Sequence, residues 1–287
     1  EAQELVDCLM LLSAEYIGPD SVQVCTIGGR DPEGRPVDNA LTRIFLQSCS
    51  HAPVQPAQVA LLVRGDTPHE TLRFALEQLA TGCSQPQLYN DDVITQSMRD
   101  WGFPEAQSHD YGNCGCVEIV PCACSGIFTV SPYHNLVAML LEAMRTLPGD
   151  FETLKSRFVE IVRREVRREN LRERRDQMER ARNGNECLRA SCLVNDCLAR
   201  GMSVDEGGAR YNHIQPNFLG LSNTVDGLAA VNRLVYESGE YDMPRLLEIL
   251  DSNFEKEPSL RARIIHRFPH FGTNEPETDA LMKWLGE

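Results

Sequence analysis

The strongest constraint on the fold is the alternation of short apolar runs and helix-type segments in the first 100 residues. The runs have the length and composition of buried strands. They span residues 21–29, 58–64 and 86–89. The segments after them carry apolar residues at helical spacing and span residues 39–50, 66–79 and 92–100. Alternating strands and helices favour parallel pairing, so the sequence predicts an α/β fold.

Beyond residue 150 the pattern is mostly helical, and one long amphipathic helix is expected around residues 157–182. That segment holds ten arginines and six interleaved acidic residues, which favours a solvated helix face over a nucleic-acid-binding arm. The formal net charge of −14 also argues against nucleic acid as a partner, because such binding depends on cationic surface.

The chain has 287 residues, and no apolar stretch in it approaches the roughly 20 residues of a membrane helix. No secretory leader is recognisable. We therefore expect a cytoplasmic protein without a membrane partner. The first residue is Glu1, which suggests a piece of a longer protein.

The 11 cysteines form an odd-numbered set without a secretory signal, which favours reduced and largely buried thiols. Cys187, Cys192 and Cys197 are expected in a helical stretch, packed in the core. Two C-x-C pairs, Cys114–Cys116 and Cys122–Cys124, have enough thiolates for a metal, although structural zinc sites favour C-x-x-C.

One pair of side chains within this cysteine-rich segment has a specific chemistry. Cys116 and Glu118 are two residues apart, so in an extended loop both side chains emerge on the same side. A neighbouring carboxylate raises a thiol pKa and disfavours the nucleophilic thiolate. A protonated thiol is instead a good hydrogen-atom donor, and the carboxylate can take a proton from a substrate hydroxyl. The pair favours radical elimination over cysteine-dependent hydrolysis.

The segment Gly115-Cys116-Val117-Glu118 resembles the G-C-V-E loop of glycyl radical enzymes, the family of pyruvate formate-lyase and several dehydratases. Further blocks resemble family motifs and occur in family order. They are residues 27–29 with 34 and 39–42, then 90–94, 207–212 (GGARYN), 220–231 and 251–254.

The resemblance implies a ten-stranded α/β barrel with many surrounding helices, of which residues 1–287 supply mainly the second half as an interior fragment. It implies that Cys116 is the thiyl residue and Glu118 the general base. Thr129 and Tyr133 are implied to line the substrate pocket, and no metal ligand is implied.

The expected function is that of a glycyl radical dehydratase or lyase acting on a small hydroxylated molecule. The implied cofactor is a protein glycyl radical on a residue outside this chain, because no R-V-x-G-Y-type motif is present. An iron–sulfur activating enzyme that uses S-adenosylmethionine installs that radical. A homodimer, an anaerobic bacterial source and a bacterial microcompartment are also implied.

Three alternatives stay open at this point. The chain is a non-catalytic or split-subunit relative, has formate C-acetyltransferase-like activity, or is a cysteine-rich metal-binding module. The formate-lyase branch places two adjacent cysteines at the active site, whereas Cys116 is followed by Val117. Family members usually continue G-C-V-E with proline, whereas this chain has Ile119.

Overall fold

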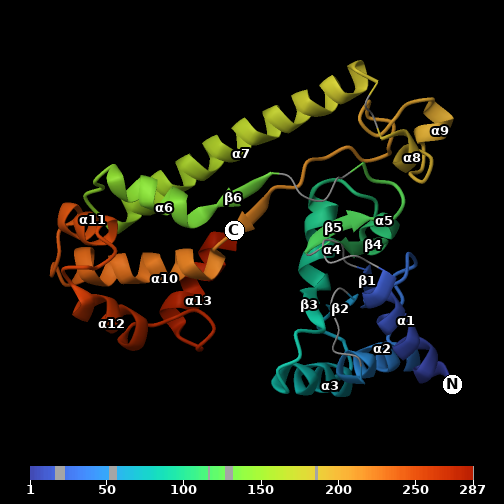
Figure 1. The fold of residues 1–287 in the computed structure, drawn as a ribbon, viewed down its shortest axis with the longest axis horizontal. Helices are drawn as coiled ribbons and strands as arrows, with labels where there is room; N and C mark the ends of the chain where they lie inside the picture. The colour runs from blue at the N-terminus through green and yellow to red at the C-terminus, as the bar shows by residue number, and fades with distance from the viewer. Residues whose placement is uncertain (17–22, 52–56, 116, 127–131, 185–186, 287) are drawn as a thin grey trace. The chain divides into compact units, whose positions relative to one another are not determined.

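The structure is a computed structural model that describes residues 1–16, 23–51, 57–115, 117–126, 132–184 and 187–286. The chain divides into two compact units, shown in Figure 1. The first unit comprises Glu1–Thr129 and Ala181–His213, and the second comprises Val130–Arg180 and Ile214–Glu287. Each unit has its own sheet and its own buried residues, so each is described separately.

The first unit contains the predicted parallel sheet. Its strands are β1 (Gln23–Gly28), β2 (Ala57–Val63) and β3 (Gln87–Asn90), paired in that order. Both pairings are parallel. The connecting helices are α2 (Ala40–His51) and α3 (His69–Ala80), and α4 (Asp91–Asp100) follows β3 directly. The α/β prediction for this part of the chain is therefore confirmed.

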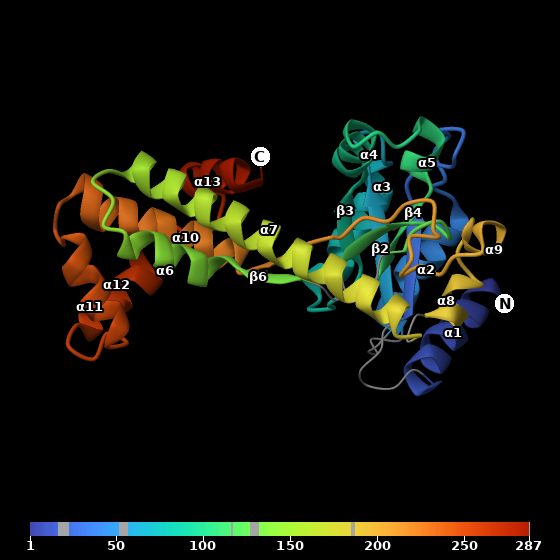
Figure 2. The ribbon, with the colours of Figure 1, turned by 90° about the horizontal axis from the view of Figure 1, so that it is seen from above.

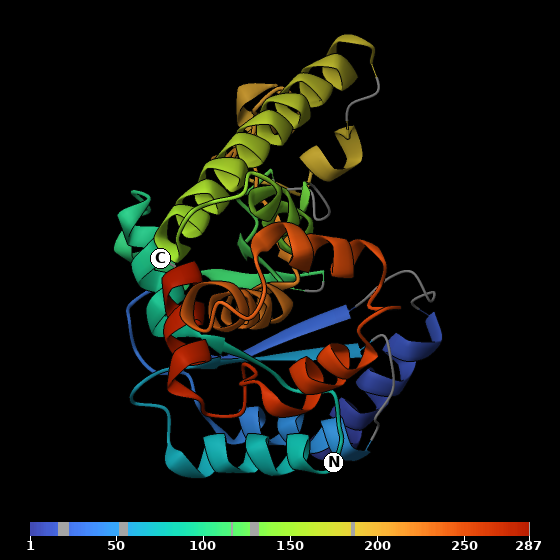
Figure 3. The ribbon, with the colours of Figure 1, turned by 90° about the vertical axis from the view of Figure 1, so that its left-hand side faces the viewer.

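The pleat of the sheet separates two different environments. Ile27, Val59 and Leu61 point to the side that packs against α2 and α3, which run together along one face of the strands in Figure 3. Leu62 points to the opposite side and packs against Tyr111. Helix α1 (Ala2–Tyr16) contacts α2 and β2.

A hairpin occupies the side of the sheet opposite α2 and α3. It consists of β4 (Tyr111–Cys114) and β5 (Glu118–Pro121), which are antiparallel and follow the short helix α5 (Glu105–His109). Tyr111 and Ile119 of the hairpin pack with Leu62 of the sheet. The segment with the predicted active site thus lies against the parallel sheet of the first unit.

The stretch around Cys187, Cys192 and Cys197 departs from prediction. It forms two four-residue helices, α8 (Leu188–Ser191) and α9 (Cys197–Arg200), separated by a turn in which Asp196 has a φ of 77°. The interruption removes a common helix face, so only Cys197 is buried and the other two thiols are exposed. The prediction of core packing was wrong for both.

The wider prediction of largely buried thiols was also wrong. Among the ten described cysteines, three are buried, three are half-buried and four are exposed. The exposed thiols include Cys8, which lies on α1, and Cys122, which comes directly after β5.

The second unit is mostly helical, as predicted. A short parallel pair, β6 (Tyr133–Asn135) with β7 (Asn217–Leu219), is its described sheet. The helices are α6 (Leu136–Arg145), α7 (Phe151–Arg182), α10 (Leu221–Val231), η1 (Asn232–Glu237), α11 (Met243–Asp251), α12 (Pro258–Arg267) and α13 (Pro276–Gly286). Figure 2 shows α6, α7 and α10 side by side. Their apolar faces meet in one core that includes Leu140, Phe158 and Leu228.

The described strands form one three-stranded and two two-stranded sheets. The mixed arrangement agrees with the predicted α/β class, and the ten-stranded barrel remains a prediction. Within the described residues, no helix is long and apolar enough to cross a membrane.

The turn after β1 requires glycine for a steric reason. Gly28 and Gly29 have φ values of 75° and 78°, a region that strains other residues. A Cβ on Gly28 would also lie 2.8 Å from the carbonyl oxygen of Leu62, whereas a Cβ on Gly34, with a φ of 79°, would meet nothing within 4 Å. Gly28 is therefore required both by its positive φ and by the close approach of Leu62, whereas Gly34 is required only by its positive φ.

We predict that Gly28→Ala destabilises the first unit more than Gly34→Ala does. The control change should cost about 1 kcal/mol from backbone strain, and Gly28→Ala about 1–3 kcal/mol more because of the clash with β2. Urea unfolding followed by circular dichroism measures both. Equal losses would contradict the close approach of β1 and β2 at this turn.

Candidate active site

The predicted catalytic carboxylate lies at the start of β5. Glu118 is 3% exposed, and its Oε2 accepts a hydrogen bond from the backbone N–H of Val117 at 3.0 Å. Cys114 is directly opposite Glu118 in the β4–β5 register. Cys116 falls in the connection between the two strands and lies outside the described residues. The structure therefore shows where the carboxylate is held.

Three hydrogen bonds attach the hairpin to the parallel sheet and to the helix that follows it. The hydroxyl of Tyr111 donates to Oδ1 of Asp91 at 2.5 Å, and both residues are buried. The backbone N–H of Asn113 donates to Oγ1 of Thr26 at 3.1 Å, and its side-chain Nδ2 donates to Oε1 of Gln87 at 3.0 Å. The hairpin is thereby bound to both outer strands of the sheet.

The Tyr111–Asp91 contact joins a protonated phenol to a carboxylate. Burial raises the pKa of Tyr111, and the hydrogen bond and charge of Asp91 raise it further, so the hydroxyl stays a donor. A helix N-terminus favours negative charge, and Asp91 is the first residue of α4. The contact fixes the beginning of β4, three residues before Cys114.

The acidic pair Asp91-Asp92 stands in the first turn of α4 but does not cap the helix. The capping residue is Asn90, whose side chain accepts from the N–H of Val93. Asp91 binds Tyr111, and Asp92 accepts from the N–H of Gly65 at 2.7 Å. The first-turn acids instead hold the hairpin and the end of β2. Sequence reasoning missed this because the partners are distant in the chain.

Two described thiols of the hairpin region have raised pKa values. Partial burial raises the pKa of Cys114, and the charge of Glu118, directly opposite, adds to the effect. Desolvation of its sulfur raises the pKa of Cys122 to about 11 although the residue is exposed overall, and Asp110 contributes further. Protonated thiols are poor nucleophiles and competent hydrogen-atom donors.

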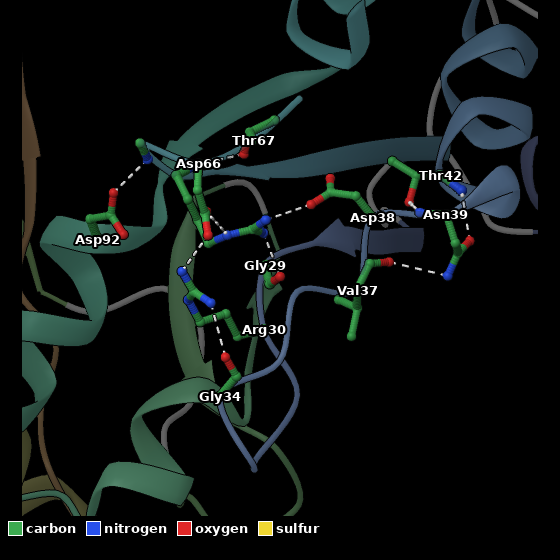
Figure 4. Close-up of polar contacts among 12 residues, drawn as sticks. Gly29, Arg30, Gly34, Val37, Asp38, Asn39, Thr42, Asp66, Thr67 and Asp92 are labelled. Atoms are coloured by element: carbon green, nitrogen blue, oxygen red, sulfur yellow. Dashed lines mark hydrogen bonds and ion pairs between the residues drawn. The ribbon is translucent and has the colours of Figure 1, made fainter. Parts of the chain in front are cut away.

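A polar network fixes the carboxyl end of the sheet, as Figure 4 shows. Arg64, whose side chain is 1% exposed, bonds to Asp38 at 2.6 Å and Asp66 at 2.7 Å, and also to the carbonyl of Gly29. A buried cation requires such partners, because desolvation would otherwise destabilise the fold. Arg64 thus ties the loop after β1 to the end of β2.

The Gly207–Asn212 block lies beside the segment that follows the hairpin. The N–H of Tyr211 donates to the carbonyl of Cys124 at 3.0 Å, and the N–H of Gly126 donates to the carbonyl of Tyr211 at 2.9 Å. A Cβ on Gly208 would lie 2.2 Å from the carbonyl oxygen of Met202, so glycine is required there. Two blocks far apart in sequence therefore meet next to the active-site segment.

The other two predicted site residues, Thr129 and Tyr133, are not seen together in the described part of the chain. Thr129 lies outside the described residues. Tyr133 is the first residue of β6 in the second unit and is 48% exposed. Among the residues that the structure describes, no three potential ligands gather closely enough to hold a metal ion.

The parallel sheet carries on one face a hairpin that holds a buried carboxylate, so the first unit is an α/β arrangement with a candidate active-site segment. Residues 1–287 match the pyruvate formate lyase-like family, so the chain belongs to that family. The family resemblance seen in the motifs is thereby confirmed.

Two similar proteins of known activity are dehydratases. The chain is 26% identical to (2S)-3-sulfopropanediol dehydratase of Klebsiella oxytoca, over 91% of the chain and 34% of that protein. It is 24% identical to trans-4-hydroxy-L-proline dehydratase of Clostridioides difficile, over 98% of the chain and 39% of that protein. The chain thus spans little more than a third of these relatives.

Solved structures share the fold. The glycerol-bound B12-independent glycerol dehydratase from Clostridium butyricum matches with a TM-score of 0.78 at 22% identity, covering 98% of this chain and 39% of that chain. A glycyl radical enzyme from Archaeoglobus fulgidus matches with a TM-score of 0.71 at 25% identity, covering 96% and 37%.

We predict that Tyr111→Phe destabilises the hairpin by about 2 kcal/mol, because it leaves the buried Asp91 carboxylate without its phenol donor. Hydrogen exchange of the backbone amides of residues 111–121, read by mass spectrometry, should accelerate accordingly. Tyr89→Phe is the matched control. It removes a hydroxyl bonded to the neutral side chain of Gln87 and should cost less.

A double-mutant cycle measures the interaction free energy between Tyr111 and Asp91 separately from the other contacts of each residue. With Asp91→Asn as the second change, the two effects should be less than additive by about 1–2 kcal/mol. Additive losses would show that Tyr111 and Asp91 stabilise the first unit independently.

Proposed function

We propose that this chain forms part of the catalytic core of a glycyl radical dehydratase or lyase. The observation that carries the proposal is the G-C-V-E segment, which includes buried Glu118 and follows a strand hydrogen-bonded to the sheet. The family match over residues 1–287 and the dehydratase activities of the relatives support it.

The proposed roles follow from the side chains. Cys116 loses its hydrogen atom, and its sulfur then takes one from the substrate carbon that bears a hydroxyl. The Glu118 carboxylate takes the hydroxyl proton, which assists departure of the group on the neighbouring carbon. The Cys116 thiol formed in the first step finally returns a hydrogen atom to the product radical, so the thiyl radical is regenerated. The broken bond is C–O, C–N or C–S.

The proposed cofactor is a protein glycyl radical on a residue outside this chain, which supplies the unpaired electron. An activating enzyme with S-adenosylmethionine and an iron–sulfur cluster is the proposed source of that radical. The raised pKa values of Cys114, opposite Glu118, and of Cys122, beside Asp110, fit this chemistry, because both thiols favour the protonated form. A homodimer with a small-molecule substrate completes the proposal.

The substrate pocket is proposed to include Thr129 and Tyr133. The solvent-exposed ring of Tyr133 at the start of β6 is available to contact a ligand. Relatives act on trans-4-hydroxy-L-proline, (2S)-3-sulfopropanediol and isethionate, which share a small hydroxylated skeleton. We propose the same substrate class for the complete enzyme.

A split-subunit or non-catalytic role is the second candidate. It is favoured by the departure from the family pattern directly after the G-C-V-E segment, where this chain has Ile119 in place of the usual proline. In that case residues 1–287 bind substrate or a partner and another polypeptide carries the radical.

The test is anaerobic reconstitution of the chain with the remaining parts of a related dehydratase and its activating enzyme. The probes are glycerol, propane-1,2-diol, trans-4-hydroxy-L-proline and isethionate. Electron paramagnetic resonance reads the glycyl radical, and product analysis reads turnover. We expect Cys116→Ala to abolish turnover with the glycyl signal retained. Glu118→Gln should lower kcat about 100- to 10,000-fold.

Cys192→Ala is the control, since this exposed thiol lies outside the hairpin. It should leave both the signal and the turnover unchanged. A glycyl signal with no turnover of any probe in the unmutated assembly would favour the non-catalytic role. Turnover that survives Cys116→Ala would overturn the proposed mechanism.

A further inference from the structure

Three cysteines from separate elements meet on the helix-covered face of the parallel sheet, away from the hairpin. Cys25 is in β1, Cys49 is near the end of α2, and Cys83 is in the connection between α3 and β3. Cys25 shares a strand face with Ile27, and Ile27 and Cys83 pack against the cluster that contains Cys49. The proposed reaction uses none of these thiols.

Cys49 and Cys83 are in direct contact through the end of α2. The Sγ of Cys83 lies 3.3 Å from the carbonyl oxygen of Cys49, and the Sγ of Cys49 lies 3.4 Å from the carbonyl oxygen of Phe45. One thiol thus donates to the residue that carries the other. Cys49 is buried, whereas Cys83 is half-buried and accessible to a small reagent.

The local electrostatics support proximity of all three sulfurs. Burial raises the pKa of Cys49 to about 12, and negative charge on Cys83 or Cys25 would raise it further. The Cys49 thiol is therefore mostly protonated at neutral pH. A reagent reacts first at the accessible Cys83 thiol, and the following attack by Cys49 is the slow step, because little Cys49 thiolate is present.

We propose that Cys49 and Cys83 form an intramolecular disulfide under oxidising conditions, a reversible covalent link between α2 and the connection that leads into β3. Cys25 remains a free thiol beside the link. The site is a thiol-modification site separate from the hairpin, and it does not depend on the proposed radical function.

The reaction balances with a two-electron thiol oxidant such as diamide. The Cys83 thiolate adds to one nitrogen of the N=N bond, and the other nitrogen takes a proton. The Cys49 thiolate then attacks the Cys83 sulfur, so the S–N bond breaks and the S–S bond forms. The released hydrazine carries the two electrons and two protons lost by the thiols. A phosphine reductant reverses the change.

The link would close a loop that contains β2 and α3, the central strand and the helix packed beside it. It also adjoins Gln85, whose Oε1 accepts from the N–H of Val59 at 3.1 Å. Closing a loop reduces the conformational freedom of the unfolded chain. Oxidation should therefore stabilise the first unit without changing the contacts of the opposite, hairpin-bearing face.

The experiment treats the 287-residue chain with diamide at pH 8 and maps disulfides by mass spectrometry of unreduced peptides. We expect a Cys49–Cys83 peptide pair and a rise in Tm of about 5–10 °C that phosphine treatment reverses. Cys8→Ala, which removes an exposed thiol on α1, is the matched control and should behave like the unmutated chain.

Cys49→Ala and Cys83→Ala should each lose both the cross-linked peptide and the rise in Tm. The Tm of each reduced variant shows whether the substitution unfolds the first unit. If Cys83→Ala does so, Cys83→Ser provides the same test, because serine is closer to cysteine in size and polarity. Absence of the peptide pair in oxidised folded protein, or a Tm rise that persists in Cys83→Ala, would overturn the proposal.

Discussion

The buried hydrogen bond between Tyr111 and Asp91 is the contact on which the position of the active-site segment depends. It joins the start of the hairpin to the N-terminus of α4, where the carboxylate is favoured by the helix dipole. The other hairpin contacts, made by Asn113 to Thr26 and Gln87, require β4 to be already aligned with the sheet. The phenol–carboxylate contact is also the shortest of the three and the most deeply buried.

Burial gives this arrangement a chemical consequence. Desolvation of the sulfur and neighbouring carboxylates disfavour thiolates, and both effects raise the pKa values of Cys114 and Cys122. That environment would disable a hydrolase that needs a thiolate nucleophile, and it suits a thiol that exchanges hydrogen atoms. The same physical effect that makes the segment stable thus selects among the reactions available to it.

The sequence predicted the local strands and helices well, because their periodic patterns depend on residues that are close together in the chain. The three parallel strands and helices α2, α3 and α4 fall where the apolar spacing placed them. Glu118 was selected by its motif, and its catalytic role stays a prediction. Asp91, Tyr111 and Asn113 were missed as anchors, since a contact across 20 or more residues leaves no periodic signal. The break at Asp196 was missed because its left-handed backbone overrides helical spacing.

Because side chains alternate between the two faces of a pleated sheet, the short strand β1 contacts the hairpin on one face and the thiol cluster on the other. Thr26 accepts the hairpin amide of Asn113, whereas the adjacent Cys25 and Ile27 face the helices and the thiol cluster. A shift of β1 by one residue would exchange these faces, removing the hairpin's acceptor and placing Ile27 under a polar loop. Register is held against that shift by the glycine turn at Gly28 and by Arg64, which binds the Gly29 carbonyl. The polar edge of the sheet therefore contributes to the active-site segment without contacting it, by keeping each side chain of β1 on its correct face.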